Sequence, residues 1–238
     1  MGPGLIPQDQ AGHIVVEGRY PRFDRLTGQS TPSAISEANW VSCTARSDKR
    51  RVILDAAVRV FARQGFHTCR VSDIADEAGV AYGLVYHYFS SKEAILDTLF
   101  LERWDVMLAA IAEADASERS PRDKLHAIAA FIIDSYGHDP ELMKVIIVEV
   151  TRAANTFGRT HLGKIRDAYA QIAAIVARAQ AEGVFRAEIT PEFAAQAFYG
   201  SIEQVLSGWI FDSVPVGEAE LEHAKTLIVE TICRGLER

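Results

Sequence analysis

The sequence predicts an all-α fold, in which a small N-terminal head of three helices is followed by a larger helical bundle. Apolar residues recur at helical spacing almost without interruption from about residue 51 to the C-terminus. No stretch alternates apolar and polar residues as a half-buried strand would. A single glycine, Gly79, separates two short helical stretches, which indicates a helix-turn-helix within the head.

The chain is expected to divide into three parts. Residues 1–46 are rich in Gly, Pro, Ser and Gln and have no sustained period, so we expect a disordered extension. Residues 47–93 form the helix-turn-helix head. Residues 94–238 form a bundle large enough to hold a core and a pocket of its own.

The segment from Val71 to Phe89 is the helix-turn-helix. Ile74 falls on the inner face of the first helix and Val85 on that of the second, and Gly79 allows a turn in which a side chain would be an obstruction. The second helix of such a unit enters a major groove of DNA, and its first turn meets the base edges. The residues of that turn are Ala81, Tyr82 and Gly83. Tyr82 is expected to contact a base, the alternative being a solvent-facing residue without a role.

The helices of the bundle follow from their own start and stop signals. The stretch Ser90-Ser91-Lys92-Glu93 has the form of a capping box, prolines stand where three later helices would begin or just after, and Gly183 follows a long helix. The helices are expected at about residues 93–114, 121–137, 140–155, 162–181, 191–211 and 218–236.

The charge of the chain is distributed unevenly. The net charge is -7, but residues 45–93 carry eight basic and six acidic residues, a net charge of +2, whereas residues 94–238 carry -8. Arg46, Lys49, Arg50 and Arg51 lie together where the first helix is expected. Because affinity for DNA depends on the local field over about 8–10 Å, an acidic bundle is compatible with a DNA-binding head.

Composition also excludes several classes of protein. No apolar run approaches the roughly 20 residues that cross a bilayer, and the N-terminus lacks the pattern of a signal peptide, so we expect a cytoplasmic protein without a membrane contact. The three cysteines have no paired metal-ligand spacing, and we expect reduced thiols, no metal and no cofactor.

Two short motifs invite an enzymatic interpretation. Gly158 to Ile165 matches the spacing G-x-x-x-x-G-K, but Ile165 stands where the Ser or Thr that holds magnesium would be. Glu220 and His223 have the spacing of a di-iron ligand pair, which that chemistry requires twice. We therefore expect no catalytic residues.

At the residues from Arg51 to Phe100 the chain resembles the TetR family of bacterial transcriptional regulators. The likeness rests on Gly65-Phe66, Asp73-Ile74-Ala75, Ala78-Gly79-Val80, Tyr86-His87-Tyr88-Phe89 and Ser91-Lys92-Glu93. The resemblance implies phosphate contacts from Tyr86, Tyr88 and Lys92, with further contacts from the basic cluster and the second helix. The DNA-binding residues expected in total are Lys49, Arg50, Arg70, Ser72, Ala81, Tyr82, Gly83, Tyr86, Tyr88 and Lys92.

A ligand pocket is expected between the helices of the bundle, lined by bulky apolar groups and a few polar ones. Glu149 interrupts an apolar helix, and it either pairs with Arg152 or faces the polar end of a ligand. The expected ligand contacts are Trp104, Met107, Phe131, Met143, Glu149, Arg152, Tyr169 and Trp209. The Glu-x-x-Arg helix and the stretch Phe198–Phe211 are similar to members of the family that respond to fatty-acyl-CoA, which implies a long-chain acyl-CoA effector.

The last two helices are expected to form a homodimer, since each carries a stripe of small or apolar residues that permits close helix contact. The interface residues are Phe193, Ala197, Gly200, Gln204, Leu227, Ile228 and Thr231. A monomer that packs these stripes internally is the alternative. In the homodimer, the two heads would contact an inverted repeat in double-stranded DNA.

These expectations combine into a ligand-responsive repressor that releases its operator when it binds an apolar small molecule. The competing hypothesis is a helical carrier of hydrophobic ligands, or an interaction protein, that does not bind DNA.

Overall fold

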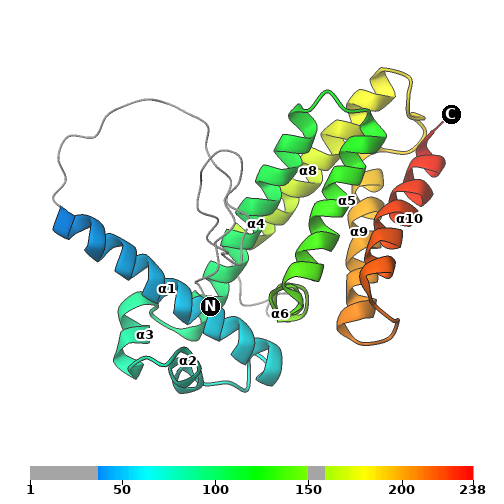
Figure 1. The fold of residues 1–238 in the computed structure, drawn as a ribbon. Helices are drawn as coiled ribbons and strands as arrows, with labels where there is room; N and C mark the ends of the chain where they lie inside the picture. Colours follow the sequence, from blue (N-terminus) through cyan, green and yellow to red (C-terminus); the bar gives the residue numbers. More distant parts are fainter. Residues whose placement is uncertain (1–36, 150–158, 238) are drawn as a thin grey trace, which may run out of the picture. The chain divides into compact units, whose positions relative to one another are not determined.

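A computed structural model of the chain describes the backbone of residues 37–149 and 159–237 and the side chains of residues 48–148 and 161–237. Within these residues the fold is all-α, as predicted (Figure 1). The only extended pairing in this part of the chain is an isolated bridge between Phe185 and Glu237. Of the extension expected at residues 1–46, residues 1–36 lie outside the described residues.

Three helices form the head. They are α1 (Glu37–Gln64), α2 (Val71–Ala78) and α3 (Tyr82–Tyr88). Helix α1 begins at Glu37 rather than near residue 47, so the expected boundary at residue 46 falls inside a helix.

The turn between α2 and α3 has the geometry that the glycine predicted. Gly79 adopts φ 62° and ψ 38°, in the left-handed region that L side chains rarely occupy, and its N–H donates to the carbonyls of Ala75 and Asp76. Ile74 of α2 and Val85 of α3 are buried, and α2 packs against both α1 and α3. The turn therefore fixes the direction in which α3 leaves the head.

The remaining elements form the bundle. They are α4 (Lys92–Ala116), α5 (Pro121–His138), α6 (Pro140–Lys144), the π-helix η1 (Val145–Glu149), α8 (Arg159–Ala181), α9 (Pro191–Ile210) and α10 (Glu218–Leu236). Among the helices of the described ranges, none is both long and apolar enough to cross a membrane.

Three helices of the bundle begin in the same way, with a polar cap followed by proline. Ser120, Asp139 and Thr190 each accept a hydrogen bond from the backbone N–H three residues on, which satisfies one of the free donors of the first turn. The proline that follows has no N–H, which at this position would have no partner within the helix, and its φ is already set for a helix. These local signals explain why the expected starts of α5, α6 and α9 agree with the structure.

The segment after Lys144 differs from expectation. The sequence predicts one α-helix from Pro140 to about residue 155, but the backbone widens into a π-helix at Val145–Glu149. A π-helix is uncommon and is often found at functional sites. Residues 150–158 lie outside the described residues.

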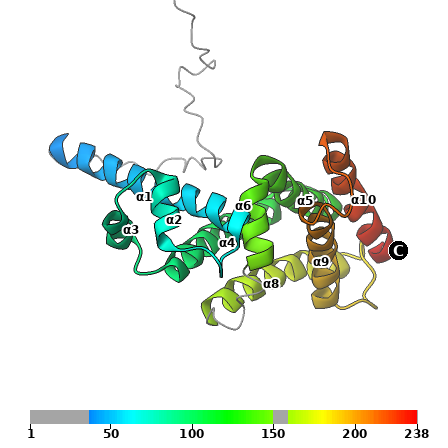
Figure 2. The same ribbon diagram turned by 90° about the horizontal axis from the view of Figure 1, so that it is seen from below.

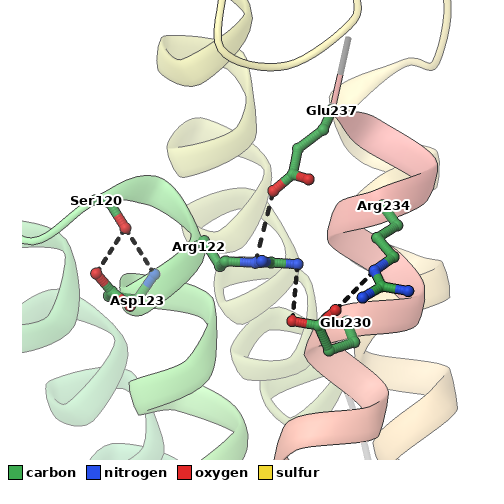
Figure 3. A network of polar contacts seen from close by, with 6 residues as sticks. All are labelled: Ser120, Arg122, Asp123, Glu230, Arg234 and Glu237. Atoms are coloured by element: carbon green, nitrogen blue, oxygen red, sulfur yellow. Dashed lines mark hydrogen bonds and ion pairs between the residues drawn. The ribbon is translucent and has the colours of Figure 1, made fainter.

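The bundle is held together by helix pairs that are distant in sequence. Helix α4 packs against α5 and α8, α8 against α9, and α10 against α5 and α9 (Figures 1 and 2). Arg122 of α5 forms ion pairs with Glu230 at 3.0 Å and Glu237 at 3.5 Å, which join the start of α5 to the end of the chain (Figure 3). The buried Lys225 of α10 pairs with Asp134 of α5.

A carboxylate joins α2 to α1 in the head. Glu77 accepts from Arg59 Nε at 2.6 Å and from Arg63 at 3.0 Å. The hydrogen bond from Arg59, and then that from Arg63, lowers the pKa of Glu77 below its usual 4.5.

Replacing Glu77 with Gln is expected to lower the Tm of the protein at pH 7 by about 1–3 °C, because both ion pairs are partly exposed. A lowered folded-state pKa contributes stability that is present above the unfolded value and is lost as pH falls through the folded value. The difference in Tm between wild type and Glu77→Gln should therefore shrink below about pH 4.5. Asp76→Asn, on the exposed side of the same helix, is the matched control, and an equal loss there would show that the ion pairs are not the cause.

Candidate nucleic-acid interface and ligand cavity

A groove of about 580 Å³ crosses the head where α2, α3 and α4 meet. Its lining brings together five of the predicted DNA-binding residues, Arg70, Ser72, Tyr82, Tyr86 and Lys92. The first turns of α2 and α4 both border the groove, and the free N–H groups and positive dipole end of a helix start favour anions. The two helix starts therefore favour an anion at the rim of the groove.

The exposed face of α3 stands next to this groove. The side chain of Tyr82 is 53% exposed, and that of Tyr86, one turn later, is exposed as well. The Tyr82 and Tyr86 hydroxyls share a hydrogen bond of 3.2 Å, and this bond is the main cause of a raised pKa at Tyr86. Ala81 and Gly83 are exposed on the same turn, and a Cβ added at Gly83 would meet open space. The first two turns of α3 thus offer two aromatic side chains and a bare stretch of backbone to a partner.

Lys92 has a different environment from the one expected. Its ammonium donates to the carbonyls of Phe66 at 2.8 Å, Cys69 at 3.1 Å and His67 at 3.4 Å, and it lies 4.8 Å from the centre of the Phe66 ring. An ammonium has three protons, so these carbonyls account for its donors. Lys92 holds the loop between α1 and α2 and borders the groove, rather than presenting a free charge to it.

The other predicted DNA contacts lie outside the lining of the groove. Lys49 is exposed on α1. Arg50 donates to Glu102 of α4 at 2.7 Å and lies over the Phe89 ring, so it links the head to α4. Tyr88 is half-buried. Glu93, which the sequence analysis did not select, lines the groove and adds a negative charge there.

The second candidate site is a small cavity of about 20 Å³ in the bundle. It is surrounded by side chains of α4, α5, α6, η1 and α9, and these include the predicted ligand contacts Trp104, Met107 and Met143. A volume of this size holds about one water molecule. The side chains of the bundle therefore fill the space in which a larger ligand would lie.

The other predicted ligand contacts are not among the residues that line this cavity. Phe131 lies beneath the guanidinium of Arg103, which is 5.0 Å from the ring centre. Tyr169 packs edge-on against Tyr199 but lines a separate groove of about 520 Å³ between α8 and α9. Trp209 packs on Tyr136 and lines a depression of about 220 Å³ that faces α1. The side chain of Glu149 and all of Arg152 lie outside the described residues.

The cavity contains polar side chains that the sequence analysis did not select as ligand contacts. Arg103 of α4 is 8% exposed, and Glu203 of α9 is half-buried beside Tyr199. Burial raises the pKa of Glu203, and burial followed by the Glu203 charge raises that of Tyr199. A signal for Arg103 was present, because it occupies the apolar face of α4 one residue before Trp104.

Helix α8 contacts α4 between the groove and the cavity. The buried His161 of α8 places Nε2 3.4 Å from Asp97 Oδ1 and its ring 4.4 Å from that of Phe100. Burial lowers the pKa of His161, against the opposing effect of the Asp97 charge. The first third of α4 thus packs against α8, and a displacement of α4 requires α8 to adjust.

The head and the cavity are also joined by α6. Helix α1 packs against α6 and η1 as well as α4. Met143 of α6 and Ile146 and Ile147 of η1 form part of the cavity wall. The part of the cavity wall that α6 and η1 form therefore lies next to α1 of the head.

The predicted dimer residues are mostly on the surface of α9 and α10. Phe193 is 63% exposed and Leu227 54%, and Gly200, Gln204 and Thr231 are exposed as well, with Ala197 half-buried. Ile228 is the exception, because it is 6% exposed and packs inside the core of the chain. Successive helix positions differ by about 100°, so Leu227 and Ile228 face different directions.

Comparison with known proteins gives the family. Residues 53–99 match the family described as bacterial regulatory proteins, tetR family, and residues 100–230 match the family described as YsiA-like protein, C-terminal region. The chain belongs to the TetR family.

Individual TetR-family relatives are similar over most of their length. The fatty acid metabolism regulator protein of Bacillus subtilis is 30% identical over 176 residues, which cover 71% of this chain and 90% of the relative. The transcriptional repressor NicS of Pseudomonas putida is 29% identical, over 78% of this chain and 91% of its own. Among solved structures, the regulator FadR of Bacillus subtilis in complex with stearoyl-CoA has a TM-score of 0.67 at 24% identity, covering 78% of this chain and 98% of that one.

The contacts of Lys92 predict a structural effect that is separate from any role on DNA. Lys92→Met should lower the free energy of unfolding by about 1–2 kcal/mol, because three carbonyls lose a charged donor in a half-buried site. Urea denaturation measures this value. Lys49→Met, which removes an exposed charge of the same head, should leave it within about 0.5 kcal/mol of wild type. Unchanged stability in Lys92→Met would show that its bonds to the loop carbonyls are unimportant.

Proposed function

We propose that this TetR-family chain is a cytoplasmic, homodimeric repressor that binds an inverted-repeat operator and releases it when an apolar effector enters the bundle. The proposal rests on the observation that α4 contributes residues both to the groove in the head and to the cavity in the bundle. This helix supplies Lys92 to the groove of the head and Arg103, Trp104 and Met107 to the cavity. The proposal includes no enzymatic activity and no cofactor.

The DNA-binding part of the proposal assigns two roles within the head. The first turn of α3, with Tyr82 and Gly83, meets base edges, and the two helix starts that border the groove receive phosphates. Arg70 adds a positive charge at the rim. Lys92 acts here mainly by fixing the loop that carries Arg70.

Dimerisation is proposed through α9 and α10. Phe193, Gly200, Gln204, Leu227 and Thr231 leave an exposed stripe on these helices that combines large apolar with small residues. Covering Phe193 and Leu227 with a second copy would remove much apolar surface from water. A two-fold pair would place its heads on half-sites about 34 Å apart or somewhat more.

A long-chain acyl-CoA is the effector class that the relatives favour. The Bacillus subtilis relative is named as a regulator of fatty acid metabolism, and the FadR structure with the same fold holds stearoyl-CoA. The predominantly apolar lining of the cavity supports a ligand with a long apolar chain.

The size of the cavity supports a coupling between effector and head. A pocket for a small molecule has a volume of about 300–1,000 Å³, whereas the cavity holds about 20 Å³. Effector binding therefore requires the walls to move apart. Two of those walls, α4 and the α6–η1 segment, contact the head directly.

The experiment that tests the function is a titration of the full chain with palindromic fragments from the promoter of its own gene, followed by fluorescence anisotropy. Retention at low salt that stearoyl-CoA relieves supports the proposal. Typical coupling energies are about 1–3 kcal/mol, or 5–150-fold in affinity, and operator DNA must weaken stearoyl-CoA binding by the same factor. Binding of stearoyl-CoA with indifference to every DNA fragment would instead favour the carrier hypothesis.

Gly83→Ala separates DNA contact from folding. The added methyl group meets open space within the chain, and alanine favours a helix by up to about 1 kcal/mol over glycine, so thermal stability should be kept or raised. Operator affinity should fall about tenfold, because the methyl group lies where α3 approaches the base edges. Gly163→Ala on α8, where a Cβ also meets open space, should leave operator affinity unchanged. Equal affinity of Gly83→Ala and wild type would exclude close approach of the DNA at this turn.

A further inference from the structure

The turn that joins α9 to α10 exposes three large apolar side chains close together in sequence (Figure 1). Phe211 is 60% exposed, Val214 46% and Val216 43%. Single apolar residues scattered over a surface are normal, but a local group of large ones marks a contact with a partner. We call residues 211–216 the apolar turn.

Hydrogen bonds hold the apolar turn in a defined conformation, although its side chains are exposed. The Asp212 N–H donates to the carbonyl of Trp209 at 3.1 Å, and the N–H and the hydroxyl of Ser213 both donate to that of Gly208 at 2.9 Å. Asp212 adopts φ 52°, in the left-handed region, where the chain turns away from α9. The apolar side chains are therefore presented on a fixed backbone, which lowers the entropic cost of a contact.

The apolar turn continues a face of α9 that is exposed along its whole length. Phe193 and Phe211 are 18 residues apart, which is five helical turns, so they lie on the same side of the helix about 27 Å from each other. Between them this side carries Ala197, Gly200 and Gln204. A Cβ added at Gly200 would meet open space within the chain, so the helix is bare at this point.

The exposed face of α9 has very little charge. Glu192 in the first turn is the one charged residue among the exposed positions of this helix, and Glu203 is half-buried in the cavity wall. Each chain has a net charge of -7, so two copies repel each other unless they meet where charge is absent. Interface cores are depleted of charged residues in the same way. A second copy of this chain is therefore the partner that this face fits.

The apolar turn is too small to hold a partner by itself. A stable interface between proteins buries at least about 1,000 Å², and three side chains supply only part of that area. Contact at the turn therefore requires a larger surface beside it. The exposed face of α9, together with Leu227 of α10, provides such a surface, and the turn forms one end of it.

This end of α9 is the one that borders the head. The depression of about 220 Å³ beside the end of α9 is lined by Ala62 and Arg63 of α1 as well as by Ile210 and Asp212. Phe193 lies at the opposite end of the helix. A contact between two copies at the apolar turn would therefore act next to the heads, whereas a contact at Phe193 would act far from them.

We propose that Phe211, Val214 and Val216 form the end of the interface between two copies of this chain that is nearest the heads, and that they fix the separation of the two heads. This inference rests on the proposed function, because it requires the homodimer through α9 and α10. It adds that the separation depends on the apolar turn rather than on the other end of α9.

Sedimentation of the full-length protein measures the dimer. Phe211→Ser and Val214→Ser should each raise the Kd of the dimer about tenfold or more, because a two-fold interface loses the same apolar contact twice. Val184→Ser is the matched control, since Val184 is 44% exposed in the connection between α8 and α9, and it should leave the Kd unchanged. Circular dichroism checks the fold, and Val216→Ser provides the answer if Phe211→Ser lowers the Tm.

Operator binding separates the spacing of the heads from the strength of the dimer. The probes are a palindromic promoter fragment that wild type binds and versions of it whose half-sites are moved by one or two base pairs. At protein concentrations well above the Kd, wild type and Phe193→Ser should prefer the same fragment by the same factor. Phe211→Ser should bind that fragment about fivefold or more weakly and discriminate less among the spacings, because its heads are no longer held at one separation.

The outcomes distinguish this inference from the proposed function. A wild-type dimer whose Kd is the same in Phe211→Ser and Val214→Ser overturns the inference and leaves the proposed function intact. A raised Kd with unchanged discrimination among spacings removes the role in head separation. Wild type that stays monomeric removes the homodimer and the inference together, and leaves the apolar turn to a different protein. Wild type that dimerises but binds no DNA fragment removes the repressor function, and sedimentation alone then decides the contact.

Discussion

Helix α4 is the element on which the other parts of the structure depend, because it contributes residues to both candidate sites. With 25 residues at about 1.5 Å each it is roughly 37 Å long, so it can extend from the head through the bundle. At its start Ser91 caps the helix and Lys92 holds the loop that precedes α2. Nearly three turns later Arg50 of α1 pairs with Glu102, directly before the first residue of the cavity wall, Arg103. The head is thus fixed to the same helix that encloses the cavity.

The small volume of the cavity has an energetic consequence for this arrangement. An effector can change operator affinity only if it binds one arrangement of the protein better than another. A preformed pocket could accept a ligand without any movement, but a space of about 20 Å³ cannot. Its side chains are close-packed, and packed interfaces adjust in discrete steps more readily than by gradual deformation. The π-helix η1 lies in the wall where such an adjustment would be needed, and a widened backbone turn can be rearranged at lower cost than a regular helix.

The sequence predicted those features that depend on a few neighbouring residues. The turn at Gly79, the helix starts at Pro121, Pro140 and Pro191, and the end of α8 near Gly183 are local, and each agrees with the structure. The fold class and family followed from the same short-range patterns. The start of α1 was wrong by several residues, because it lies in a stretch whose composition suggested disorder. The limits of the predicted domains and the assignment of individual contact residues remain predictions.

Composition could not show which bulky residues share the cavity, because that depends on how helices far apart in sequence are rotated. Trp104, Met107 and Met143 meet there, whereas Tyr169 and Trp209, chosen for the same reason, face other surfaces. Lys92 shows the same limit, since nothing in the sequence indicates that three carbonyls of the preceding loop surround its ammonium.

Arg103 and Glu203 illustrate why the polar part of a ligand site is harder to predict than its apolar part. A charged residue on a helix is usually solvated, so even a position on an apolar face, such as that of Arg103, is only a weak reason to place it inside a bundle. Burying such groups is costly, and a protein that only needed a stable core would place apolar side chains of similar size there. The bundle retains both residues beside Tyr199, in the wall of a cavity that eight apolar side chains otherwise line. A protein retains such groups where they contribute something other than the stability of the core, and that contribution depends on neighbours from other helices, which the pattern of a single helix does not show.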